Sequence, residues 1–123
     1  MTIIDVGAGA GVFAAYTLTR WPEAKIICYE ASQRGVTALK LRFANEPRVT
    51  IIHGAVVPDG TKGPVKLYCG NDYRDSSLIQ SEATLDTYEL CPAIPLSSLP
   101  EYHIINIEMN GGEKALSVAL GKL

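Results

Sequence analysis

The sequence predicts an α/β fold in which a parallel β-sheet lies between layers of helices, a three-layer α/β/α arrangement. Short apolar runs alternate with segments of helical periodicity, and strand, helix, strand, helix, strand in this order favours right-handed crossovers and parallel strands. The chain has 123 residues, the length of one domain. It is 47% hydrophobic and 20% charged, which is typical of a folded globular protein.

The first strand and helix are predicted from an apolar run over 3–6 and a helical segment over 12–20, joined by a glycine-rich stretch. The expected apolar side of this helix includes Val12, Ala15, Tyr16 and Leu18. Pro22 ends the helix, because proline disfavours helical geometry in the residue before it. A second strand follows over 25–29 and ends at Glu30.

A second helix is predicted after Ser32, a residue type that caps helix N-termini. Its apolar positions, spaced by three and four residues, are Val36, Leu39 and Phe43. Asn45 and Pro47 end this helix, and a third strand follows over 49–53.

The second half of the chain predicts an antiparallel β-ribbon over 65–94, inserted before the fourth core strand. Residues 65–69 alternate like a half-exposed strand, and a second strand-like run over 88–94 contains Pro92, which favours an edge position. Residues 103–107 form the fourth core strand, and a helix is expected over 112–120. The prediction is therefore about four core strands and a ribbon, all within one domain over 1–123.

Composition and charge exclude several classes of protein. Eleven basic and 13 acidic residues give a net charge of −2, which does not suit a general nucleic-acid binder. Three cysteines without a Cys-x-x-Cys spacing indicate a reducing compartment, with Cys28 buried in a strand and no metal site. No uncharged stretch near the start is long enough to span a membrane. We expect a soluble cytoplasmic protein.

A glycine-rich loop is the main candidate for a functional site. The sequence Asp5-Val6-Gly7-Ala8-Gly9-Ala10-Gly11 joins the first strand to the first helix. Glycines permit a tight turn and the close approach of a ligand, and the helix start attracts electronegative groups. Glu30 lies 19 residues after Gly11, at the end of the next strand. A carboxylate there could accept hydrogen bonds from two ribose hydroxyls.

Two classes of ligand fit this loop. Gly9-x-Gly11-x-x-Ala14 matches the motif of nicotinamide- and flavin-dinucleotide sites. Asp5, however, places a carboxylate at the loop entrance, where it disfavours a pyrophosphate and favours a cationic ammonium or sulfonium group. S-adenosylmethionine has these cationic groups, a ribose for Glu30 and no phosphate. We therefore favour S-adenosylmethionine, with an NAD(P)-binding protein as the alternative.

These residues resemble the first two motifs of class I S-adenosylmethionine-dependent methyltransferases, which have a Rossmann-like fold. Three later segments resemble the FkbM-type methyltransferases: His53-Gly54-Ala55-Val56, Ser76-Ser77-Leu78 and Glu108-Met109-Asn110-Gly111-Gly112-Glu113. The resemblance spans about residues 3–120. It implies a cofactor site that comprises Asp5, Gly7, Ala8, Gly9, Gly11, Glu30, Ala31, Gly54 and Ala55.

The resemblance also implies methyl transfer to an oxygen acceptor, a hydroxyl of a sugar or another small molecule. Glu108 is the first candidate for a catalytic base and His53 the second. The sequence departs from the family at three positions: Glu108 stands where the family has Asp, Asn110 where it has Glu, and Asn106 where it commonly has Lys. Because cofactor binding tolerates these changes better than catalysis does, an inactive binding or assembly domain is a second alternative.

The family fold has seven strands in the order 3-2-1-4-5-7-6, so the sequence predicts a truncated version of it. The fourth strand would then lie at an edge with unpaired backbone groups, which proteins cover or use for pairing with another chain. We expect a homodimer through this strand or the helix after it. An inactive fragment is the competing explanation.

Overall fold

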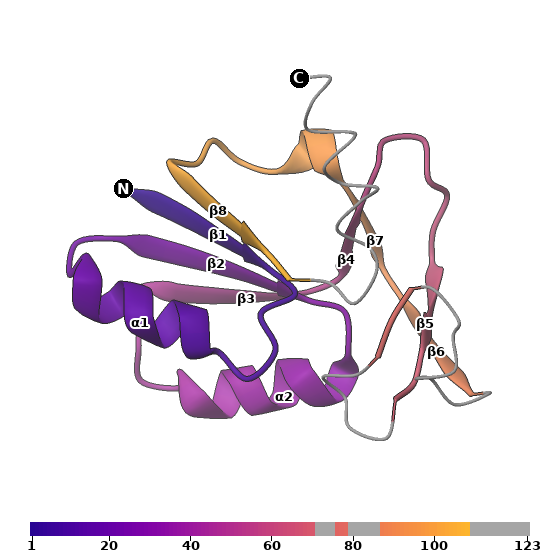
Figure 1. The fold of residues 1–123 in the computed structure, drawn as a ribbon, viewed down its shortest axis with the longest axis horizontal. Helices are drawn as coiled ribbons and strands as arrows, with labels where there is room; N and C mark the ends of the chain where they lie inside the picture. The colour runs from indigo at the N-terminus through magenta and orange to yellow at the C-terminus, as the bar shows by residue number, and fades with distance from the viewer. Residues whose placement is uncertain (71–75, 79–86, 109–123) are drawn as a thin grey trace.

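The structure is a computed structural model that describes residues 1–70, 76–78 and 87–108. Its main element is a four-stranded parallel sheet (Figure 1). Its strand order is β3-β2-β1-β8. The strands are β1 (Thr2–Val6), β2 (Lys25–Glu30), β3 (Val49–His53) and β8 (Ile104–Ile107). The four predicted core strands are confirmed to within one residue at either end, and the protein has a mixed α/β fold.

The register of the sheet brings polar residues from separate strands to one edge. Asp5 on β1 is the register partner of Cys28 on β2 and of Asn106 on β8. Glu30, the last residue of β2, is the partner of His53, the last residue of β3. Because the strands are parallel, their carboxyl ends meet at the same edge, toward which the strands converge in Figure 1.

Both described helices, α1 (Val12–Arg20) and α2 (Gln33–Arg42), cover the same face of the sheet. The buried cluster on this face consists of Ile3, Ala8, Ala14, Ala24, Ile26, Cys28 and Leu39. The predicted cap is confirmed: the Ser32 hydroxyl accepts a hydrogen bond from the Gly35 amide at 3.2 Å. Neither helix is long and apolar enough to cross a membrane.

The buried side of α1 differs from the one predicted. Ala14 and Thr17 are fully buried against the sheet, whereas Val12 and Tyr16 are 70% and 57% exposed. The small side chain of Ala14 lets the helix lie close to the strands. The Thr17 hydroxyl donates to the Ala14 carbonyl at 2.8 Å, so its burial leaves no unpaired donor. Leu18 does pack against the core, as predicted.

On the opposite face of the sheet, the described part of the chain supplies strands and a short 3₁₀ helix. This face packs against the strands β4 (Ala55–Val57) and β7 (Ala93–Pro95) and a 3₁₀ helix, η2 (Leu96–Ser98). The buried residues of this second cluster are Ile4, Val6, Tyr29, Val56 and Leu96. The helix predicted over 112–120 lies outside the described residues.

The inserted β-ribbon is confirmed, with one correction. β5 (Val65–Tyr68) pairs antiparallel with β6 (Tyr88–Cys91). The predicted run over 88–94, however, divides at Pro92, and β7 pairs parallel with β4 instead. Pro92 has no backbone N–H to continue the β5–β6 ladder. Its carbonyl accepts a hydrogen bond from the Ala55 amide at 2.8 Å. The chain therefore changes partner at the proline.

Candidate functional site

A cavity of about 840 Å³ lies at the carboxyl ends of β1, β2 and β8. Its size is within the range of roughly 300–1,000 Å³ found for small-molecule sites, and its position is typical of ligand sites in open parallel sheets. The described residues that line it are Asp5, Val6, Gly7, Ala8, Gly9, Ala10, Val12, Phe13, Tyr16, Glu30, Ala31, Gly54, Ala55, Val56, Leu67, Ser76, Ser77, Leu78, Asn106 and Glu108.

The glycine-rich loop forms one wall of the cavity, and most of its amides bind protein acceptors. The amides of Gly7 and Ala8 both donate to the Tyr29 carbonyl, at 2.8 and 3.2 Å. The Gly11 amide donates to the Ala8 carbonyl at 2.9 Å, and the Gly9 amide donates to Oε1 of Glu30 at 3.0 Å. These four N–H groups are therefore not available to cradle a phosphate.

Gly9 and Gly11 have different roles, although both have positive φ angles, of 57° and 82°. A Cβ atom added at Gly9 would have only the Gly7 carbonyl within 4 Å, at 3.8 Å, so this position is open. At Gly11 an added Cβ would lie 2.8 Å from Cε2 of Phe43, and Gly11 is not among the residues that line the cavity. Gly11 thus permits the start of α1 to pack against Phe43 and Leu39, whereas the lack of a side chain at Gly9 leaves space in the cavity.

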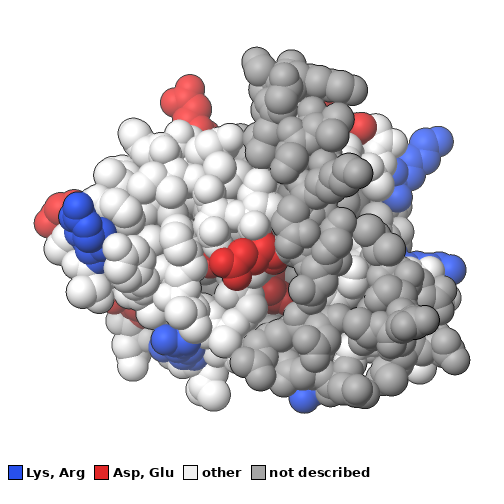
Figure 2. All heavy atoms as spheres, viewed as in Figure 1, with Lys and Arg blue, Asp and Glu red and all other residues white. Residues whose placement is uncertain are grey.

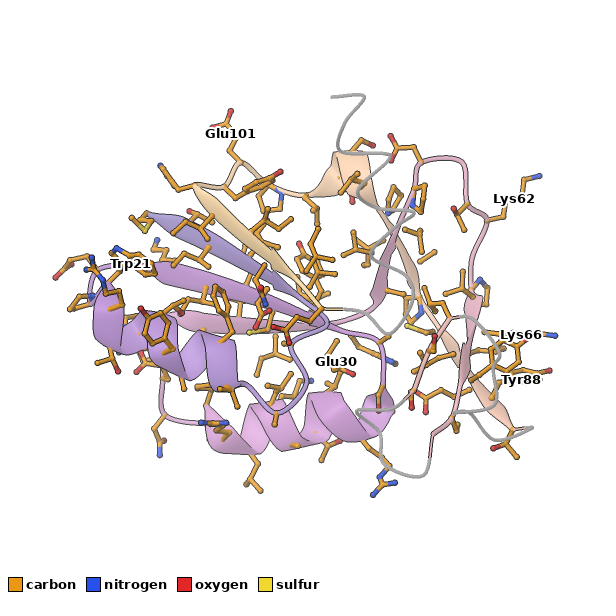
Figure 3. The ribbon with its side chains drawn as sticks, viewed as in Figure 1. Trp21, Glu30, Lys62, Lys66, Tyr88 and Glu101 are labelled. Carbon is orange, nitrogen blue, oxygen red and sulfur yellow. The ribbon has the colours of Figure 1, made fainter. Side chains whose placement is uncertain are left out.

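Glu30 connects the glycine loop to the start of α2, and Figure 3 shows it between them. Its side chain is 7% exposed. Oε1 accepts from Gly9, and Oε2 accepts from the Ser32 amide at 2.9 Å. Burial raises the pKa of Glu30, and the two backbone hydrogen bonds partly oppose this rise. Each carboxylate oxygen can accept a further hydrogen bond from a ligand.

Asp5 has an unsatisfied oxygen beside the cavity. The residue is 1% exposed, and its Oδ1 accepts a hydrogen bond from Nδ2 of Asn106 at 3.0 Å. Oδ2 has no partner among the described residues. Burial raises the pKa of Asp5 to about 6; the Asn106 hydrogen bond lowers it, and the charges of Glu108 and Glu30 raise it further. A buried unpaired oxygen is costly, and a donor or cation from a ligand would relieve that cost.

The charged residues that line the described part of the cavity are all acidic: Asp5, Glu30 and Glu108. Figure 2 shows a group of acidic side chains near the middle of the face viewed, with the visible Lys and Arg side chains set apart from it. The charges of these described residues therefore favour cationic groups in the cavity and disfavour anionic ones.

The two predicted catalytic residues are placed differently. Glu108 directly follows β8 and lines the cavity, where its backbone amide donates to the Val6 carbonyl at 2.9 Å. His53 is not among the lining residues, and its Nε2 lies 2.9 Å from the Ala31 carbonyl. The structure therefore brings Glu108 to the cavity, whereas the ring of His53 contacts the segment that follows β2.

The remaining predicted cofactor residues lie together. Ala31, Gly54 and Ala55 line the cavity, as do Gly7 and Ala8. The Gly54 amide donates to the Glu30 carbonyl at 3.0 Å, which joins the ends of β2 and β3. Ser76, Ser77 and Leu78, from the ribbon segment of the FkbM-like pattern, line it too. Asn110 and Glu113 lie outside the described residues.

Sequence reasoning missed the apolar lining residues Val12, Phe13, Tyr16 and Leu67, and the pairing of Asn106 with Asp5. The position of Asn106 near the end of a core strand is a signal for the pairing, because parallel strand ends share an edge. No sequence signal distinguishes helix residues that face a cavity from those that face the core.

The described residues contain no group of three or more His, Cys, Asp or Glu side chains that could hold a metal ion. Neither the models of known protein families nor the curated proteins give a match to this sequence.

Proposed function

We propose that this chain is a Rossmann-like domain of the methyltransferase type that binds S-adenosylmethionine and methylates a hydroxyl of a small molecule or sugar. The observation that best supports the proposal is the unpartnered Oδ2 of Asp5, buried beside a cavity whose charged described residues are all acidic. A ligand with an ammonium and a sulfonium group would supply the missing positive charge.

The residues present fit the nucleoside part of this cofactor. Glu30 would accept hydrogen bonds from the ribose hydroxyls, while the amides of Gly9 and Ser32 hold its carboxylate in place. Each hydrogen bond to a charged acceptor contributes roughly 1.5–3 kcal/mol. Gly54 and Ala55 offer a small-residue surface for an adenine edge.

The same loop fits a dinucleotide poorly. Pyrophosphate sites use free loop amides and the positive end of a helix. Here the amides of Gly7, Ala8 and Gly11 donate to backbone carbonyls, and the Gly9 amide donates to a carboxylate. A phosphate placed at Gly9 would lie against the Glu30 carboxylate without a Lys or Arg among the described lining residues to balance the charge.

The chemistry of methyl transfer needs little acid–base assistance at the donor, because the bound cofactor supplies a methyl group on a positively charged sulfur. The protein must hold the acceptor in line and remove a proton from it. Glu108 is the described carboxylate best placed to take the proton, because it lines the cavity and is exposed at the end of β8. A base in this role contributes roughly 10²–10⁴-fold to the rate.

Calorimetry tests cofactor binding directly. We expect S-adenosylmethionine and its demethylated product to bind, and NADH and FAD not to bind. Gly9→Arg should abolish binding because it fills the open cavity wall. Gly60→Arg is a matched control, since Gly60 also has a positive φ and open space around it but does not line the cavity. If neither nucleoside gives a heat of binding to the folded protein, the proposal is wrong.

Transfer of a labelled methyl group to hydroxylated small molecules tests catalysis. Glu108→Gln should lose transfer and keep the binding of the demethylated product. Glu101→Gln, an exposed position outside the cavity, should change neither. If the native protein binds the cofactor but transfers its methyl group to none of the acceptors, the alternative of an inactive binding domain is favoured.

A further inference from the structure

The mouth of the cavity has an apolar wall formed by Val12 and Tyr16 of α1. The two residues are one helical turn apart and therefore lie on the same side of the helix. They remain 70% and 57% exposed although both line the cavity. The smaller residues of α1, Ala14 and Thr17, occupy the core instead. The helix thus presents two large apolar side chains to the cavity.

Tyr16 is held in a defined orientation at this mouth. Its ring contacts that of Trp21 edge to face, with centroids 6.5 Å apart and planes at 84°. Trp21 in turn packs against the buried cluster between α1 and the sheet. A ring that is already fixed loses little conformational freedom when a ligand packs on it. Tyr16 is therefore a preorganised surface for a ring of a ligand.

The ribbon lines the same cavity with apolar residues. Leu67 of β5 is 4% exposed and belongs to a buried cluster against which Leu78 packs. Both residues line the cavity, together with the hydroxyl-bearing Ser76 and Ser77. The cavity therefore combines apolar surfaces from α1 and the ribbon with neutral hydrogen-bonding groups.

We propose that the methyl acceptor is a hydroxylated molecule with an apolar ring that packs on Val12 and Tyr16, and that it is uncharged or cationic. This inference rests on the proposed function. With the cofactor bound to Asp5 and Glu30, an anionic acceptor would have to approach the carboxylate of Glu108, with no basic side chain among the described lining residues. Like charges in a partly desolvated site repel strongly. Phosphorylated and carboxylated sugars are therefore disfavoured as acceptors.

Three probes that differ in charge test the inference. 4-Ethylphenol is neutral, tyramine is cationic and 4-hydroxyphenylacetate is anionic, while all three carry the same phenol ring. Their dissociation constants would be measured by NMR titration of the protein saturated with the demethylated cofactor. Glucose 6-phosphate, a phosphorylated sugar, would be titrated as a second anion. We expect 4-ethylphenol and tyramine to bind about tenfold more tightly than either anion.

Two variants locate the bound ring. Tyr16→Ser should weaken the binding of 4-ethylphenol about three- to tenfold, because it removes apolar contact area. Its effect on the affinity for the demethylated cofactor should be smaller than this. Leu41→Ser is the matched control: Leu41 is 80% exposed on α2 and does not line the cavity, so its loss should change neither affinity.

The outcomes separate this inference from the proposed function. If the demethylated cofactor binds but an anionic probe binds as tightly as 4-ethylphenol, the inference is wrong and the proposed function stands. The same holds if no phenol binds, or if Tyr16→Ser and Leu41→Ser affect 4-ethylphenol equally. If the demethylated cofactor itself does not bind, the proposed function fails first.

Discussion

Asn106 and Asp5 form a hydrogen-bonded pair between the adjacent strands β8 and β1, with Nδ2 of Asn106 donating to Oδ1 of Asp5 at 3.0 Å. The pair fixes the carboxylate and leaves Oδ2 without a partner among the described residues. Asn106 is neutral, so it orients the charge of Asp5 without cancelling it.

Replacing Asp5 by Asn should stabilise the fold at neutral pH. Burial raises the pKa of Asp5 to about 6 from an ordinary value of 3.8, so the folded state binds more protons than the unfolded state between these values. The free energy of unfolding therefore falls by about 3 kcal/mol in total as the pH rises from about 4 to 6. Denaturant unfolding of Asp5→Asn should show a gain of this order at pH 8 and none at pH 4.

Asp59→Asn is a control, because the stability that Asp59 contributes changes with pH in the opposite direction to that of Asp5. The Ser97 amide donates to Asp59 at 3.0 Å and lowers the pKa of that carboxyl. Asp59 therefore contributes stability above its unfolded pKa that is lost at lower pH, and Asp59→Asn should not stabilise the protein at pH 8. If Asp5→Asn also fails to stabilise it there, Asp5 is not a strained buried charge.

Binding of S-adenosylmethionine should weaken as the pH falls through about 6. Protonation of Asp5 removes the charge that we propose attracts the cationic group of the cofactor. Calorimetry over this range should show a loss of affinity in the native protein and a flatter profile in Asp5→Asn, whose affinity should be lower at neutral pH. An unchanged affinity below pH 6 would contradict a role for the Asp5 charge in binding.

The sheet and the glycine site were predictable because local patterns determine them. Apolar runs identify the four core strands, Ser32 identifies the start of α2, and the spacing from Gly11 to Glu30 places a carboxylate at the neighbouring strand end. Glu30 ends β2 and Glu108 directly follows β8, and because these strands are parallel their carboxyl ends lie at one edge of the sheet. Both line the cavity.

The remaining features depend on contacts that no local pattern contains. Asn106 and Asp5 are 101 residues apart, and only the register of β1 with β8 joins them. The sequence predicts Val12 and Tyr16 as core residues because they are apolar, yet close packing of α1 on the sheet selects Ala14 and Thr17. Likewise, the turn of His53 toward the Ala31 carbonyl is set by tertiary geometry.

Alanine at Gly9 and at Gly11 should separate binding from stability. Both substitutions place a side chain at a positive φ, at a cost of roughly 1–2 kcal/mol. Gly11→Ala should cost about 1–3 kcal/mol more in unfolding free energy, because its Cβ overlaps Phe43 and Leu39. Gly9→Ala should chiefly weaken cofactor binding by calorimetry. Equal losses of stability in the two variants would contradict these assignments.

Removing the Glu30 side chain should affect both stability and binding. Glu30→Ala leaves the amides of Gly9 and Ser32 without their acceptor, which we expect to lower the free energy of unfolding by about 1–3 kcal/mol. Glu30→Gln keeps one acceptor oxygen and should be less destabilising, while both variants should bind the demethylated cofactor more weakly. If Glu30→Gln binds it with native affinity, the carboxylate is not needed for the ribose.

The edge strand β8 supports a last prediction, that of a homodimer. Among the described residues β8 pairs only with β1, so its outer backbone groups have no strand partner there, and such an edge can pair with another chain. Amide hydrogen exchange of Ile104–Ile107 should slow as the protein concentration rises, in parallel with dimer formation in sedimentation velocity. β3, at the other edge of the same sheet, is the internal control, and its exchange should not change. A dimer that leaves exchange in β8 unaltered must associate through another surface, whereas a monomer at every concentration excludes the pairing.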